Sequence, residues 1–184
     1  MKKMLLVLSF LLLSSNVHAV EIAGVALDPT VSVNEKTLSL NGYGIRKKFF
    51  FKVYIGSLYA SKKVSSSAEL LQNPDDKVIR MSFLHSKVEK EKITETFAEG
   101  FANNSPDVAA SADVNVFLSF FKSDFVKGDT VDLILGADGT VIARQNGKVL
   151  GTVKSAKLPN AILLIYFGQK PADEDLKQGM LGAR

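Results

Sequence analysis

The chain of 184 residues contains no cysteine, no tryptophan and only two histidines. Without cysteine it can form no disulfide bond, no thiolate zinc or iron–sulfur centre and no cysteine nucleophile. The histidines, His18 and His85, are too few for a zinc or copper site that relies on imidazole ligands. The sequence also lacks a phosphate-binding loop, a dinucleotide fingerprint and a G-x-S-x-G motif. We therefore predict no metal site and no cofactor.

Long apolar runs are also scarce, and the one present lies near the N-terminus. Residues 4–13 are apolar with a single interruption, follow two lysines, and precede a polar stretch that ends in Val-His-Ala at residues 17–19. This pattern is typical of a secretory signal peptide cleaved after Ala19. A membrane span needs about 20 apolar residues, so we expect none once residues 1–19 are removed. A lysine-led signal on a cysteine-free chain indicates the bacterial periplasm.

The charge gives little evidence of a nucleic-acid partner. The formal net charge is +4, and removal of Lys2 and Lys3 with the signal peptide halves it. The remaining lysines are interspersed with acidic residues along the chain. We therefore predict no nucleic-acid binding.

Residues 20–184 show no repeat and no linker-like stretch, so we predict a single domain. Its first half is rich in β-branched and aromatic residues, which predicts strands over residues 21–27, 37–40, 45–60 and 77–84. Asn41-Gly42 is typical of a tight turn between two of these strands. A short helix is expected over residues 65–72. A longer helix is expected after Ser86, which together with Glu89 matches a capping box.

The second half begins with a helix over residues 111–121 and then returns to strands. Asp138-Gly139 and Asn146-Gly147 are turn pairs that separate strands over residues 130–135, 140–144 and 148–154. Helices are expected over residues 158–167 and 172–180, with Pro171 at the start of the second. We interpret the acidic residues 173–175 as complementing the dipole of this last helix rather than binding a metal. The fold class is α+β, with an antiparallel sheet and helices gathered on one face.

His85 and a group of phenylalanines are candidate functional residues on their chemistry alone. His85 precedes a predicted helix, where a partly buried loop histidine is more common than a general base. Phe117, Phe120 and Phe121 have the spacing of a buried helix face, which favours core packing over the lining of a ligand cavity.

Arg46 and Tyr54 form a third candidate. They are eight residues apart on one face of the strand predicted over residues 45–60, about 26 Å from each other if that strand is straight. The same face carries Lys48 and Lys52. A solvated charged face and an anion-binding site formed by strand curvature or a bulge are both compatible with this pattern.

The stretch over residues 41–59 resembles the chalcone isomerase-like family in its short bacterial secreted form. Other segments similar to this family are Lys92-Ile93-Thr94-Glu95, Asp138-Gly139-Thr140, Gly151-Thr152-Val153 and residues 167–173. The resemblance covers nearly all of residues 20–184. It implies an open-faced β-sandwich, in which a layer of helices covers a large antiparallel sheet and a ligand cleft lies between them.

The family includes true isomerases and non-catalytic fatty-acid-binding members. The resemblance implies that Arg46 reaches the cleft, and that Tyr54, in Lys52-Val53-Tyr54, matches a tyrosine that helps to hold the ligand carboxylate in the fatty-acid-binding members. The isomerases carry a threonine at the position of Tyr54, and a tyrosine and an asparagine where this chain has Glu89 and Thr96. An ionised glutamate cannot donate a hydrogen bond, and its charge would oppose an anionic substrate.

We therefore expect a periplasmic protein without catalytic residues that binds a fatty acid or similar amphipathic carboxylate through Arg46 and Tyr54. Two alternatives remain open from the sequence. One is an isomerase or lyase acting on a small anionic, flavonoid-like substrate. The other is an interaction module whose cleft holds no small ligand.

Overall fold

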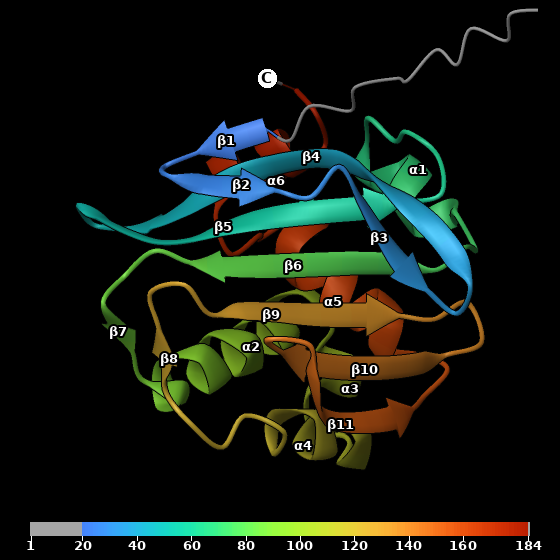
Figure 1. Ribbon diagram of the computed structural model, residues 1–184. Coiled ribbons are helices and arrows are strands. Elements are labelled where there is room, and N and C mark those ends of the chain that lie inside the picture. Colours follow the sequence, from blue (N-terminus) through green and yellow to red (C-terminus); the bar gives the residue numbers. More distant parts are fainter. Residues whose placement is uncertain (1–19, 184) are drawn as a thin grey trace, which may run out of the picture.

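The computed structural model describes residues 20–183. The predicted signal peptide, residues 1–19, lies outside the described residues. Residues 20–183 form a seven-stranded antiparallel sheet with helices packed against one face (Figure 1). The strands follow the spatial order β11 (Lys148–Lys154), β10 (Thr140–Gln145), β9 (Thr130–Leu135), β6 (Lys77–Phe83), β5 (Phe51–Ala60), β4 (Lys36–Lys48) and β3 (Thr30–Val33). The predicted α+β class, with one large antiparallel sheet and a helical layer, is confirmed.

The helical layer lies behind the sheet in Figure 1. It contains α2 (Lys90–Asn104), α3 (Pro106–Ala109), α4 (Ala112–Leu118), α5 (Leu158–Phe167) and α6 (Glu174–Met180), while α1 (Ser67–Gln72) connects β5 to β6. Helix α5 is apolar on nearly every side, which is typical of a helix buried between two layers. Two short ribbons complete the fold: β1 (Val20–Ile22) with β2 (Val25–Leu27), and β7 (Lys87–Val88) with β8 (Phe125–Val126).

The strands of the second half form the predicted antiparallel meander β9-β10-β11. Gly139, Asn146 and Gly147 adopt positive φ angles of 88°, 51° and 80° at the two turns. Glycine and asparagine tolerate these angles at little steric cost. Local turn chemistry therefore determines this part of the fold.

The strand predicted over residues 45–60 is wrong, because the chain reverses within it. Strand β4 ends at Lys48, Phe49 and Phe50 form the turn, and β5 returns antiparallel to β4. The tight turn predicted at Asn41-Gly42 is also wrong, since both residues lie inside β4. The pairing of β4 with β5 shifts register at this point, between Leu40 and Gly42, so that a bulge takes the place of the turn.

Two predicted helix starts need correction as well. Helix α2 begins after Glu89, whose side chain makes no capping bond, and the Lys90 N–H donates instead to Asp124 Oδ1 at 3.1 Å. Lys87 and Val88 pair with β8, which takes the residues of the predicted capping box out of the helix. Helix α6 begins after Asp173 rather than at Pro171. The Leu176 N–H donates to Asp173 Oδ1 at 2.9 Å, so the interpretation of this aspartate as a helix cap is confirmed.

The main core lies between the sheet and the helices and includes a cluster of phenylalanine rings. Phe117, Phe120 and Phe121 belong to this core as predicted, but the helix expected over residues 111–121 ends at Leu118, so the last two lie beyond α4. A smaller core on the outer face of the sheet contains Val33, Leu38, Tyr59, Val78 and Ile134. Among the helices within residues 20–183, none combines the length and the apolar character that crossing a bilayer requires.

Candidate ligand-binding site

Arg46 and Tyr54 lie directly opposite each other in the β4–β5 hairpin. Their Cα atoms are register partners, and the Arg46 guanidinium carbon lies 6.0 Å from the centre of the Tyr54 ring. The separation of about 26 Å expected along one straight strand is wrong, because the turn at Phe49 and Phe50 folds the two residues together. The pair therefore forms one site on the face of the sheet that meets the helices.

The inner end of this site is closed by segments near the C-terminus. Arg46 Nη1 donates to the Ala172 carbonyl at 3.4 Å, and Tyr166 of α5 packs beside Tyr54 and donates through its hydroxyl to Met81 Sδ at 3.5 Å. The space that these side chains enclose measures about 10 Å³. Such a volume holds at most one water molecule. The acyl chain of a ligand therefore has no room at this inner end in the described conformation.

An open groove extends from Arg46 in the other direction, between the β4–β5 hairpin and the start of α2. Its volume is about 370 Å³, within the roughly 300–1,000 Å³ typical of small-molecule sites. Its surface is mainly apolar, and five of its twelve lining residues are charged. The lining comprises Arg46, Lys48, Phe49, Phe51, Val53, His85, Lys87, Val88, Glu89, Lys92, Ile93 and Thr96. The groove and the closed inner space share Arg46, so the guanidinium stands at the boundary between them.

The groove is lined by four basic residues and one acidic residue, Glu89, so its net charge favours an anion. Lys87 forms an ion pair with Asp124 at 3.0 Å and Lys92 with Glu95 at 3.0 Å, both with acids outside the lining. Arg46 is half-buried, and within residues 20–183 it has no carboxylate at salt-bridge distance. A guanidinium has five N–H donors, so Arg46, which contacts the Ala172 carbonyl and the Tyr54 hydroxyl, retains capacity for a bidentate acidic ligand.

The residues at the positions where the isomerases differ also line this groove. Glu89 lies at the N-terminus of α2, and Thr96 faces the groove about two helical turns further along the helix. The Thr96 hydroxyl donates to the Lys92 carbonyl at 2.8 Å, so its proton is already engaged. Neither residue offers a free hydrogen-bond donor to a ligand anion.

His85 occupies the groove wall as a half-buried loop residue. Its Nδ1 lies 2.9 Å from the Lys87 carbonyl, and its ring meets Phe51 edge-on, with ring centres 5.5 Å apart. These contacts hold the imidazole against the hairpin. They make His85 a fixed part of the groove wall.

Tyr166 and the Ala172 carbonyl are two groups at the inner end of the site that the sequence did not predict. Tyr166 lies in an apolar helix, and its only signal is that a buried tyrosine hydroxyl usually needs a polar partner. The contribution of Ala172 is a backbone atom, which no side-chain pattern reveals. Both come from segments far from Arg46 in the sequence.

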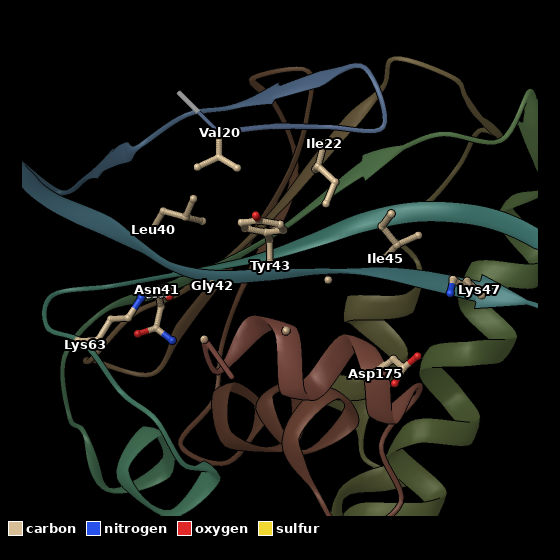
Figure 2. A pocket seen from close by; sticks show the side chains of 13 residues that line it. Val20, Ile22, Leu40, Asn41, Gly42, Tyr43, Ile45, Lys47, Lys63 and Asp175 are labelled. Carbon is tan, nitrogen blue, oxygen red and sulfur yellow. Dashed lines mark hydrogen bonds between the residues drawn. The ribbon is translucent and has the colours of Figure 1, made fainter. Parts of the chain in front are cut away.

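A second cavity lies around β4, lined by the N-terminal ribbon and by Asp175 and Gly179 of α6. Figure 2 shows Val20 and Ile22 of β1 pointing toward Tyr43 and Ile45 of β4, around a space of about 440 Å³. Its lining contains neither Arg46 nor Tyr54. The candidate site is therefore the groove on the helical side and not this space.

Comparison with known proteins identifies the family. A model of the chalcone isomerase-like family matches residues 19–182, and the chain belongs to that family. It is similar to fatty-acid-binding protein 1 of Arabidopsis thaliana, at 25% identity over 173 residues that cover 77% of this chain and 62% of that protein. The chain thus spans about three fifths of the length of this relative.

Its fold is also similar to the crystal structure of a fatty-acid-binding protein from Arabidopsis thaliana. The two share a TM-score of 0.69 and 20% identity, and the match covers 90% of this chain and 97% of the other. This likeness shows that the folds agree. The family resemblance found in residues 41–59 and the fold that it implied are both confirmed.

Burial makes three of the four tyrosines weaker acids than usual. Desolvation raises the pKa of Tyr54, with Arg46 acting in the opposite direction, and desolvation raises the pKa of Tyr166 well above its ordinary value. Burial likewise raises the pKa of Tyr59 to about 12. A native pKa above the unfolded value means that the neutral hydroxyl is favoured in the folded state, so this contribution to stability is present below pH 10 and is lost above it.

We expect the free energy of unfolding to fall as the pH rises above 10, with Tyr54, Tyr59 and Tyr166 ionising together with unfolding. An absorbance titration of tyrosinate, run beside circular dichroism, measures both events. Tyr54→Phe removes one of the three groups, so its stability should fall less steeply with pH than that of the wild type. Ionisation of all four tyrosines near pH 10 in a protein that remains folded would contradict the expected burial of the site.

Proposed function

We propose that this protein is a non-catalytic periplasmic binding protein for a fatty acid or a similar amphipathic carboxylate. The ligand carboxylate binds Arg46, and the acyl chain lies in the groove between the β4–β5 hairpin and α2. The observation that carries this proposal is the position of Arg46, a half-buried guanidinium without an acidic partner in residues 20–183, at the inner end of an apolar groove. The proposed location follows from the signal-peptide pattern of residues 1–19.

The two ends of such a ligand match the two parts of the site. A guanidinium is planar and permanently charged, so it holds a carboxylate through two parallel hydrogen bonds. The apolar walls contributed by Phe51, Val53 and Ile93 accept methylene groups, each worth about 0.8 kcal/mol when buried. Tyr54 lies beneath the guanidinium in the closed inner space, where it contacts Arg46 rather than the ligand.

The same groove is poorly suited to isomerase chemistry on an anionic substrate. An ionised Glu89 has no proton to donate to a substrate, and the Thr96 proton is held by its own helix. These residues stand where the isomerases carry a tyrosine and an asparagine. The Arabidopsis proteins that this chain resembles are also named for fatty-acid binding rather than for catalysis. These observations support binding over the isomerase alternative.

The proposal is tested by the lipids that the protein retains during native purification. Extraction and mass spectrometry of the wild type should detect a bound acyl carboxylate. Arg46→Met keeps the apolar stem of the side chain and removes the charge, so we expect about a tenfold to hundredfold loss of affinity, as for removal of a charge-assisted hydrogen bond.

Lys47→Met is the matched control, because it removes the same charge from the next residue of β4, outside the inner end of the site. This variant should retain the wild-type amount of ligand. A wild type that carries no acyl carboxylate, or an Arg46→Met variant that carries as much as the wild type, would overturn the proposed function.

A further inference from the structure

The tip of the β4–β5 hairpin exposes three consecutive phenylalanines. Phe49, Phe50 and Phe51 have exposed fractions of 85%, 98% and 60%, and every other large exposed hydrophobic residue of the described chain is a valine. Figure 1 shows this hairpin extending beyond the helical layer. Rings in this position add little to the core, so folding does not explain their presence.

The turn is also built from an unfavourable residue. Lys48 pairs with Phe51, so the loop contains two residues, and Phe49 adopts a φ of 55°. Two-residue hairpin turns favour glycine or asparagine at positive φ, and a bulky aromatic residue is strained there. A turn optimised only for stability would carry a different residue at this position.

Positive charges surround the three rings in the sequence. Arg46, Lys47 and Lys48 precede them and Lys52 follows, with no acidic residue between 46 and 52. The three lysines are exposed. Aromatic rings at a protruding tip with lysines at their base match the interfacial region of a bilayer, where rings enter among the acyl chains and ammonium groups reach lipid phosphates.

We propose that the β4–β5 hairpin tip docks this protein onto the surface of an anionic phospholipid bilayer. A protein partner fits the tip less well, because three phenylalanines expose on the order of 500 Å², whereas each side of a standard protein interface buries about 800 Å². Phe49, Phe51 and Lys48 also line the ligand groove, so docking places the groove mouth at the lipid surface. The docking itself does not depend on which ligand the groove holds.

Co-sedimentation with vesicles tests the proposal on the full chain. The mass of each preparation shows whether residues 1–19 are still attached. The wild type should bind vesicles of phosphatidylcholine with about one third phosphatidylglycerol, and more weakly as salt is added. The double variant Phe49→Ser, Phe50→Ser should bind about tenfold less or weaker still. Phe49→Gly removes one ring and also removes the strain of a positive φ at this position. It should bind vesicles less than the wild type does, and its unfolding temperature should be no lower.

Because the chain contains no tryptophan, Phe50→Trp gives a reporter at a single position. Its emission should shift to the blue on addition of the anionic vesicles. Val149→Trp places the same reporter at an exposed position of β11, at the opposite end of the strand order, and should not shift. A wild type that ignores anionic vesicles, or a double serine variant that binds as tightly as the wild type, would overturn the proposal. Self-association through the tip without vesicle binding would overturn it in favour of a protein partner.

Discussion

Replacement of Gly42 by alanine is expected to lower the free energy of unfolding by about 3 kcal/mol or more, because helix α6 rests directly on strand β4. A Cβ atom at Gly42 would lie 2.4 Å from the Gly179 carbonyl oxygen and 2.7 Å from that of Met180. Both obstacles are backbone atoms, so no side-chain rotation relieves the overlap. Asn41 strengthens the same contact, since its amide donates to the Met180 carbonyl at 2.9 Å.

The change should affect the candidate site as well as stability. The segment that precedes α6 supplies the Ala172 carbonyl to Arg46, and Asp173 Oδ2 accepts the Lys47 N–H at 3.2 Å. When α6 moves away from β4, both contacts are lost together. We therefore expect the contact of Gly42 with α6 to help position the Arg46 guanidinium.

Gly56→Ala is the matched control for Gly42→Ala. A Cβ at Gly56 in neighbouring β5 also meets α6, but its near atoms are Leu176 Cδ1 at 2.8 Å and Met180 Sδ at 3.2 Å, the flexible ends of side chains. We expect a loss of about 1–2 kcal/mol, smaller than that for Gly42→Ala. Chemical denaturation of both variants measures the difference. Equal losses, or a smaller loss for Gly42→Ala, would contradict a backbone contact between α6 and β4.

The same contact explains why the first half of the fold was harder to predict than the second. Asn41-Gly42 has the sequence of a turn, but its glycine serves close helix packing and its asparagine bonds to the backbone at Val64 and Met180. Partners of this kind come from distant segments and leave no local signal. The turn pairs at Gly139 and Gly147 use glycine for its positive φ, and there the sequence predicts the turns correctly.

The candidate site shows the same division between local and distant information. Phe49 and Phe50 contain none of the residues that mark a turn, so periodicity alone extends one strand through them and separates Arg46 from Tyr54. The family resemblance identified both residues as a pair because it compares whole sites rather than local patterns. Tyr166 reaches Tyr54 through the packing of α5, which is a tertiary fact that the sequence of that helix does not contain.

Replacement of Phe117 by alanine is expected to lower the free energy of unfolding by about 3–5 kcal/mol, the range for loss of a buried phenylalanine. Phe117 is fully buried in α4, and its ring centre lies 5.3 Å from that of Phe97, 5.4 Å from Phe121, 6.0 Å from Phe101 and 6.1 Å from Phe120. Helix α4 has only seven residues and depends on this packing, because short helices are marginal by themselves.

Val116→Ala is the control for Phe117→Ala in the same helix turn, since Val116 is 43% exposed and its change should stay within about 0.5 kcal/mol of the wild type. Urea denaturation measures both free energies. The space left by the Phe117 ring is apolar, so benzene should raise the unfolding temperature of Phe117→Ala and leave Val116→Ala unchanged. A loss below about 1 kcal/mol for Phe117→Ala would mean that the aromatic cluster is loosely packed, and would reopen its interpretation as the lining of a ligand cavity. A loss in the expected range leaves the groove at Arg46 as the proposed site for an acyl chain.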